Sequence, residues 1–396
     1  MAKLLLERFA WDDRYRVRDV DAIATPALLI YRDAVEHNIA ATIRALGGDA
    51  GRWRPHVKTA KLEYVMRMMV KHGVMAMKCA TTLELRVALD AGAHDVLIAY
   101  PLIGPAAARV REIASEHDNR RISALVENLE QAQQWRGSKV GVFLDVNPGM
   151  DRTGIEQRRH REIVELVSAV VSAGVIFRGL HYYDGHLGGL EFGPRAEAAH
   201  RGYDELMALV RELRAAKVPV EEVITAGTPA FPCSVTYSGF RNADFAHRIS
   251  PGTVIYCDAS SLAQLPEEYG YRPATLVMSR LVSHPRADII TCDAGHKTVS
   301  ADAGVPTCVV VGHPELEPLG PSEEHLPLRI REGATAPNNA PRIGDVVYLL
   351  PRHVCPTVNN FDDALIVENG SVAAVEPVTA RGRETPLVAH GVGSRA

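Results

Sequence analysis

The amino-acid sequence lacks the features that mark disulfide-rich, membrane and nucleic-acid-binding proteins. Its six cysteines (79, 233, 257, 292, 308 and 355) form no CxxC pair, which favours reduced thiols in a cytoplasmic protein over a disulfide framework. The apolar run Leu4–Leu6 is too short for a signal peptide, and no window approaches a transmembrane span. The formal charge of −4 predicts no broad attraction to nucleic acid or anionic membranes.

What the chain does contain is an alternation of strand-like and helix-like segments. Its 396 residues exceed one ordinary hydrophobic core, so two domains are expected. From about residue 24 the alternation predicts eight strands, at residues 25–31, 53–58, 75–80, 95–100, 121–126, 140–146, 175–183 and 222–226. This pattern fits a (β/α)8 TIM-type barrel. An open doubly wound sheet would need a glycine-rich dinucleotide turn after the first strand, and Tyr31-Arg32-Asp33 is not one.

After about residue 250 the helical segments stop. Short apolar runs separated by Pro and Gly turns take their place, at residues 274–284, 287–293, 307–311, 326–330, 346–350 and 364–367. Such a pattern predicts a mostly β domain, with a hairpin turn at Glu368-Asn369-Gly370-Ser371. Because the first residues also lack the barrel rhythm, the expected division is a barrel over 24–250 and a β domain formed by 1–23 and 251–396.

Polar residues gather where the predicted barrel strands end, and active sites of (β/α)8 barrels lie at the carboxyl ends of the strands. Lys58 ends the second predicted strand, 147–154 follow the sixth, 181–186 close the seventh and 225–229 close the eighth. Most lysines are solvated surface charges. A lysine at the catalytic end of a barrel is instead a candidate for covalent chemistry through its amine.

The turn Thr225-Ala226-Gly227-Thr228 suits a phosphate group. Glycine lets the backbone approach, and exposed N–H groups together with a hydroxyl can bind phosphate oxygens. Most Gly-Thr turns bind nothing, so the turn alone is weak evidence. Its position at the last predicted strand strengthens the interpretation, since phosphate sites in barrels favour the last strands.

A second chemical motif lies in the predicted β domain. An extended His353-Val354-Cys355 segment would place the imidazole and the thiol on one face of a strand. Imidazole and thiolate together suit Zn²⁺, but two ligands do not close a structural site, so water and substrate would have to complete it. The alternative is a buried thiol beside a hydrogen-bonded histidine.

Six motifs occur along the chain in this order: Pro55-His56-Val57-Lys58-Thr59, Asp151-Arg152-Thr153-Gly154, Thr225 to Pro229, Ser250-Pro251-Gly252-Thr253, Asp293-Ala294-Gly295-His296-Lys297 and His353-Val354-Cys355-Pro356-Thr357. Together they resemble fold-type III pyridoxal-phosphate enzymes of the D-threonine aldolase and D-serine dehydratase group. The resemblance spans about residues 24–370. It implies an alanine-racemase-like barrel with a β domain and pyridoxal 5'-phosphate as cofactor.

By position, the resemblance implies that Lys58 carries the cofactor. A neutral amine is the nucleophile, and burial and nearby cations such as His56 or Arg152 would favour the neutral form. Arg152 would contact the phenolic oxygen of the cofactor or the adjacent substrate. His181 and Tyr182 would lie near the cofactor ring.

The resemblance also implies a phosphate site and a metal site. The residues that would hold the phosphate are Gly227 and Thr228, with help from Ser250 and Tyr256. His353 and Cys355 would bind a divalent metal (Zn, Mn or Mg) close to the hydroxyl group of the substrate.

The reaction expected first is that of an aldolase acting on D-β-hydroxy-α-amino acids such as D-threonine, which yields glycine and an aldehyde. His186 is the candidate base, although it could equally be an ordinary loop histidine. The alternative is a D-serine or 3-hydroxy-D-aspartate dehydratase that yields a keto acid and ammonia. Cys355 favours the dehydratase, since aldolases of the group commonly have Asp there, and Asn359-Asn360-Phe361-Asp362 departs from the Asn-Leu-His-Asp that often follows.

Two other functions are less well supported. A pyridoxal-phosphate carrier without catalysis would need neither the β domain nor His353 and Cys355. A racemase would need a second acid/base, such as a tyrosine from a partner subunit, and the β domain offers no convincing candidate. A homodimer with a small D-amino acid as substrate is implied by the resemblance.

Overall fold

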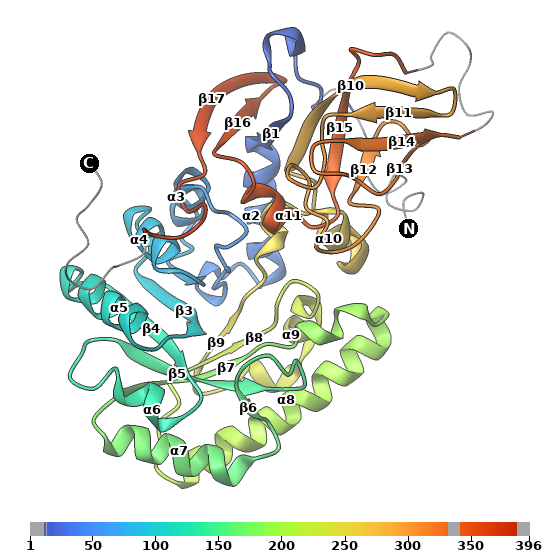
Figure 1. Cartoon of the computed structure of the whole chain (residues 1–396). Coiled ribbons are helices and arrows are strands. Elements are labelled where there is room, and N and C mark those ends of the chain that lie inside the picture. The colour runs from blue at the N-terminus through green and yellow to red at the C-terminus, as the bar shows by residue number, and fades with distance from the viewer. Residues whose placement is uncertain (1–11, 13, 332–340, 386–396) are drawn as a thin grey trace. The chain divides into compact units, whose positions relative to one another are not determined.

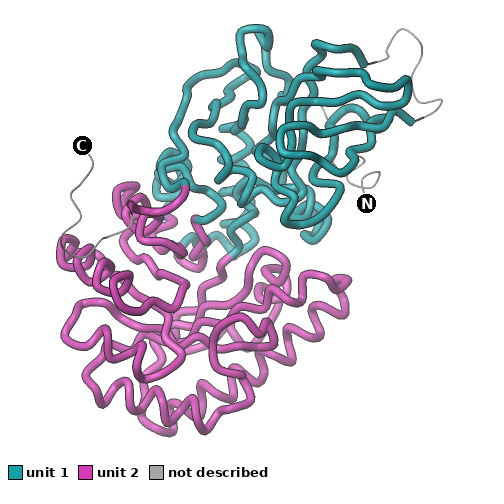
Figure 2. The backbone as a smooth tube through the Cα atoms, viewed as in Figure 1, with its two compact units in different colours: residues 1–50, 58–73, 251–381 teal, residues 51–57, 74–250, 382–396 magenta. Residues whose placement is uncertain are grey.

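The computed structural model describes residue 12 and residues 14–331 and 341–385. The chain forms two compact units, each assembled from segments that are distant in the sequence (Figure 2). Unit 1 comprises residues within 1–50, 58–73 and 251–381, and unit 2 comprises residues within 51–57, 74–250 and 382–396.

Unit 2 is built around a parallel sheet with helices packed on its outside (Figure 1). Its strands are β2 (Ala76–Cys79), β3 (Asp95–Pro101), β4 (Arg121–Val126), β5 (Gly141–Asn147), β6 (Ile155–Glu156), β7 (Ile176–Tyr182), β8 (Glu222–Thr225) and β9 (Ala246–Ile249). They pair in chain order, except that β6 lies beside β5 and leaves β5 to pair with β7. Buried side chains from four strands, Leu97, Leu125, Phe143 and Ile224, pack in the interior as expected for a barrel core.

Residues 53–57 close this sheet into a ring. Trp53 pairs with Ile249 at the end of β9, and His56 pairs with Lys78 of β2, both in parallel orientation. The segment, which we call the closing segment, therefore stands between the first and last strands of the sheet. The predicted fold class, a barrel with a mostly β second domain, is confirmed.

Two strand predictions were wrong. Residues 25–31 were expected to form the first barrel strand, but β1 (Ala27–Tyr31) pairs with strands of unit 1 instead. Conversely, β9 fills the last place of the ring, where the sequence predicts no strand. All five residues of β1 are buried, and a short apolar run does not show which sheet it joins. Lys58 consequently follows the first position of the ring instead of the second.

The helices of unit 2 follow the strands as the pattern predicts. They are α4 (Thr82–Asp90), α5 (Pro105–Glu116), α6 (Leu129–Gln133), α7 (His160–Ser172), α8 (Phe192–Ala215), α9 (Phe231–Thr236) and the short 3-10 helices η3 (Gly185–Gly189) and η4 (Ser238–Phe240). Side chains cap the starts of α4 and α6. At α4 the Thr81 hydroxyl accepts from Glu84 N, while the Glu84 carboxylate accepts from the N–H of Ala80, the residue before the N-cap, in an arrangement close to a capping box.

A buried ion cluster joins the closing segment to the amino ends of two strands. The Arg54 guanidinium donates to both carboxylate oxygens of Asp95, the first residue of β3, and of Glu222, the first residue of β8. The Arg54 side chain is fully buried. Although burial raises the pKa of Asp95, the charge of Arg54 outweighs it, so that pKa lies below its ordinary value.

Unit 1 contains the mostly β part of the chain (Figure 1). Besides β1, its strands are β10 (Thr275–Arg286), β11 (Ile289–Cys292), β12 (Cys308–Val311), β13 (Leu316–Pro318), β14 (Leu326–Ile330), β15 (Val346–Pro351), β16 (Asp363–Glu368) and β17 (Ser371–Pro377). The main order is β13-β14-β11-β10-β1-β16-β17, with β15 pairing with β10 and β12. The predicted hairpin joins β16 to β17, with Asn369 and Gly370 both at positive φ, as a primed turn requires.

The helices of unit 1 are fewer and shorter. They are α2 (Arg32–Ala45), α3 (Glu63–Lys71), α10 (Ala259–Gln264), α11 (Val354–Val358) and the 3-10 helices η1 (Val20–Ala22), η5 (Thr253–Ile255) and η6 (Glu267–Tyr269), while η2 (Ala50–Arg52) precedes the closing segment. Part of the expected β contribution of the first residues lies outside the described residues. Among residues 14–22 there is no strand, and the Val17 N–H donates to the hydroxyl of Tyr348 in β15. No helix among the described residues has the length and apolar character needed to cross a membrane.

Candidate functional site

Lys58 lies in a turn directly after the closing segment. Residues 57–60 form this turn, and the Lys58 side chain is exposed. On the amino-terminal side, Val57 N donates to Lys78 O at 2.7 Å and Lys78 N donates to Pro55 O at 2.8 Å. His56, between these two bonds, is partly buried. The amine is therefore carried at the carboxyl end of the closing segment.

The residues after Lys58 are held by buried hydrogen bonds within unit 1. The Tyr256 hydroxyl donates to Ala60 O at 2.7 Å, and the Lys61 amine donates to Ala380 O at 2.9 Å. Tyr256 is completely buried. The Tyr256 hydroxyl thus supports the turn that carries Lys58, and its expected part in holding phosphate stays a prediction.

A chain of buried polar side chains lies inside the barrel. Lys78 Nζ is 3.2 Å from His181 Nε2, His181 Nδ1 is 2.7 Å from Asp145 Oδ1, and the Thr153 hydroxyl donates to Asp145 Oδ2 at 2.7 Å. Burial and the charge of Lys78 lower the pKa of His181. Burial raises the pKa of Asp145, but His181 and Thr153 bring it below its ordinary value. A neutral His181 then donates to Asp145 and accepts from Lys78.

The two tyrosines that follow His181 point in opposite directions, as side chains alternate along a strand. Tyr182 was expected near the cofactor ring, but its ring packs on Tyr203 of α8 at 5.7 Å between centroids. Tyr183 instead faces the polar chain. Its ring centroid lies 5.9 Å from the Lys78 amine and 5.1 Å from the Arg152 guanidinium carbon. Tyr183 is therefore the tyrosine that neighbours Arg152 and Lys78, and the expected place of Tyr182 near a cofactor ring stays a prediction.

The next residue, Asp184, is a buried carboxylic acid. The Tyr203 hydroxyl donates to its Oδ2 atom at 2.5 Å. Burial raises the pKa of Asp184 to about 6, despite this hydrogen bond. Asp184 therefore holds the loop after β7 against α8.

The loop after β5 carries Arg152 and contacts His186. Asn147 Oδ1 accepts from Gly149 N at 2.9 Å and from Asp151 N at 3.1 Å, which fixes the loop. A Cβ atom on Gly149 would lie 3.5 Å from His186 Nε2, so the imidazole packs against this loop. Partial burial lowers the pKa of His186, with the Asp151 carboxylate opposing. A neutral imidazole therefore lies beside the loop of Arg152.

The predicted phosphate turn has the features of an anion site. Ala226 adopts a left-handed φ of 58°, and a Cβ atom on Gly227 would come within 2.7 Å of the Tyr183 ring. Thr228 is buried. Ser250, the residue after β9, is 2% exposed, and its hydroxyl has no hydrogen-bond partner among the described residues. A buried hydroxyl without a partner is unfavourable unless a ligand or water satisfies it, so the turn fits a phosphate group.

His353 and Cys355 do not lie on an extended strand, and that prediction was wrong. His353 is the N-cap of α11, and Cys355 lies in the first turn of this helix. Pro356 is tolerated in a first turn, where its missing N–H costs nothing. The Asp258 carboxylate accepts from Val354 N at 2.9 Å and fixes the helix start. The turn still brings the imidazole and the thiol within hydrogen-bonding reach of each other.

Each of these two side chains has a further partner that the sequence did not reveal. His353 Nδ1 lies 2.6 Å from Asp302 Oδ2, and Cys355 Sγ lies 3.0 Å from Thr59 Oγ1. Burial lowers the pKa of His353, but its hydrogen bonds with Cys355 and Asp302 outweigh this and raise it to about 9. In the described ranges, no group of three or more His, Cys, Asp or Glu side chains is placed to hold a metal ion. His353 and Cys355 would thus offer two donors of an open site.

The structure therefore gathers the predicted residues into two sets. In unit 2 the Tyr183 ring is the common neighbour of Arg152, Lys78 and Gly227. In unit 1 the turn of Lys58 is tied to Cys355. The residues that sequence reasoning missed are Thr59, Lys78, Asp145, Tyr183 and Asp302. The alternation along β7 could have indicated Tyr183, whereas nothing local marks the distant Asp302.

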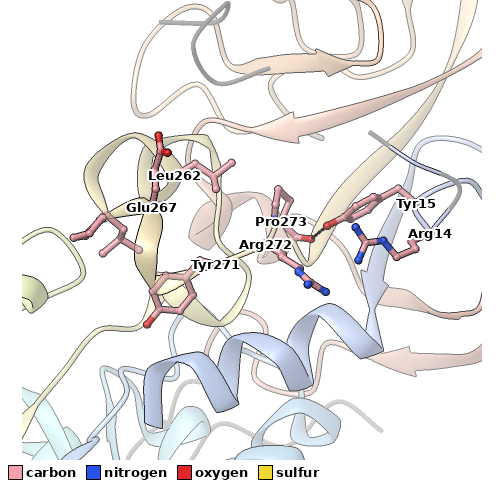
Figure 3. Close-up of a pocket in the computed structure, with 10 residues that line it drawn as sticks. Arg14, Tyr15, Leu262, Glu267, Tyr271, Arg272 and Pro273 are labelled. Atoms are coloured by element: carbon pink, nitrogen blue, oxygen red, sulfur yellow. Dashed lines mark hydrogen bonds between the residues drawn. The ribbon is translucent and has the colours of Figure 1, made fainter. Parts of the chain in front are cut away.

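A cavity elsewhere in unit 1 contains none of the predicted site residues. It measures about 310 Å³, and Arg14 and Arg272 are among the residues that line it (Figure 3). On its wall the Tyr15 hydroxyl donates to Pro273 O at 3.1 Å. Side-chain chemistry, more than cavity size, therefore locates the candidate site.

Two family models match the chain. The model of the alanine racemase N-terminal domain matches residues 30–260, more than half of the sequence. The chain belongs to this family. A model of the serine dehydratase domain matches residues 274–367. In this alanine racemase family member, the first match includes Lys58 and Arg152, and the second includes His353 and Cys355.

Similar proteins match this family member along most of its length. D-threonine aldolase of Arthrobacter sp is 26% identical over 386 residues, covering 91% of this chain and 93% of that protein. D-threo-3-hydroxyaspartate dehydratase of Delftia sp. (strain HT23) is 23% identical over 363 residues, covering 85% and 92%. The crystal structure of D-threonine aldolase from Filomicrobium marinum matches with a TM-score of 0.80 at 26% identity, covering 92% and 96%. The resemblance drawn from the six motifs is confirmed.

Proposed function

We propose that this family member is a pyridoxal-phosphate- and divalent-metal-dependent lyase for D-β-hydroxy-α-amino acids. As an aldolase it would break the Cα–Cβ bond and release glycine and an aldehyde. The observation that carries the proposal is the contact between Thr59 and Cys355, because Thr59 directly follows Lys58. This contact links Cys355, one of the two proposed metal donors, to the turn that carries the Lys58 amine. An amine site beside a metal site matches the adjacent α-amino and β-hydroxyl groups of such substrates.

The residues present fit the cofactor. Lys58 would supply the amine that binds it covalently. The unpartnered hydroxyl of Ser250 and the turn at Gly227 would hold its phosphate. Arg152 and Tyr183, which lie against each other, would flank its ring. When bound, pyridoxal phosphate supplies the electron sink for the reaction.

His353, Cys355 and His186 would all act at the β-hydroxyl group of the substrate. A divalent metal, when bound, makes a coordinated hydroxyl more acidic. His353 and Cys355 would hold it, and the thiolate favours Zn²⁺ over Mn²⁺ or Mg²⁺. The neutral His186 would accept the β-hydroxyl proton at Nε2. Lys58 would then return a proton to Cα to give glycine.

A dehydratase is the second candidate, and one observation favours it. The serine dehydratase domain model matches the segment that contains Cys355. In that reaction Lys58 would remove the α-proton, and the β-hydroxyl would leave. A keto acid and ammonia would follow by hydrolysis.

Product analysis separates the two reactions. Purified protein is incubated with D-threonine, D-serine and 3-hydroxy-D-aspartate, each with and without a chelator. Glycine with an aldehyde supports the aldolase, whereas a keto acid with ammonia supports the dehydratase and refutes the first choice. Activity that survives complete metal removal would refute the metal's part in the proposal.

The role of Lys58 has its own test. The purified protein should show an absorbance band from covalently bound cofactor. Lys58→Ala should abolish the band, while Lys71→Ala, which removes an exposed lysine at the end of α3, should leave it unchanged. A band that persists in Lys58→Ala would refute this assignment.

A further inference from the structure

Each of the two proposed metal donors has a further hydrogen-bond partner. His353 uses Nδ1 for Asp302, which leaves Nε2 as the nitrogen that can face Cys355 and a metal. Cys355 meets the Thr59 hydroxyl at 3.0 Å. Metal-binding histidines usually donate their other ring N–H to a carboxylate or carbonyl, and such partners fix the ring and raise metal affinity.

We propose that Asp302 and Thr59 are positioning residues for a divalent metal at His353 and Cys355, Asp302 by fixing the imidazole and Thr59 by donating to the thiolate. This inference rests on the metal-dependent function proposed above. It adds the two residues that would determine how tightly the metal is held.

The Asp302 side of the arrangement is built into the backbone. The Ser300 hydroxyl donates to Asp302 Oδ1 at 3.0 Å, and Ser300 N donates to the Thr357 hydroxyl at 3.2 Å. That hydroxyl in turn donates to His353 O at 2.9 Å. The loop that carries Asp302 is thereby tied to the helix that carries both donors. Together with the contact between Asp302 and His353, these hydrogen bonds form a closed ring that holds the carboxylate against the imidazole. A chance surface contact would not need such a ring.

The contact between Thr59 and Cys355 is buried, and Thr59 belongs to the turn that carries Lys58. Thr59 is 1% exposed and Cys355 is 8% exposed. A thiolate in such surroundings depends on its hydrogen-bond donors, because little solvent can replace them. Thr59 also follows Lys58 in the chain, so the same hydroxyl links a metal donor to the turn of the amine.

A simple ion pair is the alternative explanation for the contact between Asp302 and His353. Their side chains are 46% and 35% exposed, and a pair with this exposure contributes little on its own. An ion pair without a metal role predicts no change in metal affinity when Asp302 is replaced. Metal affinity therefore separates the two explanations without any measurement of activity.

The experiment uses the full-length, cofactor-loaded protein, stripped of metal and titrated with Zn²⁺ against a chromophoric chelator. Thr59→Val and Asp302→Ala should each raise the Kd about 10- to 100-fold. Thr59→Ser and Asp302→Asn, which retain a hydroxyl and an acceptor, should recover most of the affinity. With Co²⁺, a thiolate-to-metal absorbance band reports whether Cys355 still binds.

Two matched variants remove the same groups without touching the donors. Thr379→Val removes a hydroxyl that also anchors the turn after Lys58, through Lys61 O at 3.3 Å. Asp362→Ala removes an exposed carboxylate paired with Arg381. Both should bind Zn²⁺ within about twofold of the wild type.

Each outcome decides between the two proposals. Wild-type affinity in both Thr59→Val and Asp302→Ala, with binding lost in His353→Ala, overturns this inference and leaves the proposed metal site standing. Wild-type affinity in His353→Ala overturns the proposed metal site and this inference with it. Weakened binding in Thr59→Val and Asp302→Ala, recovered by the conservative variants and absent from Thr379→Val and Asp362→Ala, supports both when His353→Ala also loses the metal.

Discussion

Replacement of Arg54 by alanine tests whether the buried ion cluster holds the ring closed. Arg54 makes bidentate contacts with Asp95 and Glu222, and its side chain is fully buried. Arg248 contacts both carboxylates from β9, and Arg121 approaches Asp95 at 3.6 Å from β4. The cluster therefore connects the closing segment to strands on both sides of it.

The expected loss can be derived from the charges that remain. Removing one member of a buried ion pair costs about 3–5 kcal/mol when the other charge is left uncompensated. In Arg54→Ala, Arg248 and Arg121 remain beside Asp95 and Glu222, so the two carboxylates are not left without positive charge. The loss then comes from unsatisfied carboxylate oxygens and from the cavity. We expect the free energy of unfolding to fall by about 3–4 kcal/mol, the lower part of that range.

Urea unfolding followed by tryptophan fluorescence measures this effect, because Trp53 and Trp135 are buried in unit 2. Arg54→Lys should recover only part of the stability, since an ammonium group cannot bind two carboxylates bidentately. The control Lys139→Ala removes an exposed ion pair with Asp118 and should cost at most about 1 kcal/mol. A loss in Arg54→Ala no larger than in this control, at an unchanged urea slope, would refute the reasoning.

Three further predictions concern single side chains. Burial raises the pKa of Asp184 in the folded protein to about 6. From about pH 4 to 6 the folded protein therefore holds a proton that the unfolded chain has released. The free energy of unfolding should fall by up to about 3 kcal/mol as the pH rises through this window. Asp184→Asn removes the titrating carboxyl group, so the free energy of unfolding of this variant should rise relative to that of the wild type between about pH 4 and 6. A difference between the two proteins that does not change with pH would contradict the raised pKa of Asp184. Gly179→Ala would place a Cβ atom 1.8 Å from a carbonyl oxygen of β8, so its Tm should drop strongly, whereas Gly189→Ala, with nothing within 4 Å, should melt like the wild type. Lys78→Met removes a charge that helps lower the pKa of His181, so that pKa should rise in an NMR titration, and an unchanged value would show that burial acts alone.

Local pattern predicts much of this fold, but not where each element goes. The βα alternation and the short runs after residue 250 correctly indicate a barrel and a mostly β domain. The run at β1 reads like any buried strand, and only its pairing with β10 and β16 assigns it to the other sheet. β9, with the sequence Ala246-His247-Arg248-Ile249, is half polar because Arg248 joins the ion cluster, so hydrophobicity does not reveal it.

The candidate site shows the same limit at the level of side chains. Motifs placed Lys58, Arg152 and the phosphate turn at strand ends, because those positions follow from the alternation. The direction of Tyr182 and Tyr183 depends on the register of β7, which the sequence leaves open by one residue. Asp302 is 51 residues from His353, and only the fold of the intervening strands brings them together.

The closing segment has a consequence for the motions of the barrel. It joins its neighbours through the isolated pairings of Trp53 with Ile249 and His56 with Lys78, while β4 shares a run of at least four consecutive residue pairs with each of β3 and β5. Amide hydrogens at this seam should therefore exchange with solvent through local opening at a lower free energy than those of the central strands. Lys58 is the residue at which the seam ends. Local opening of the seam would therefore release the amino-terminal end of the turn that carries this residue.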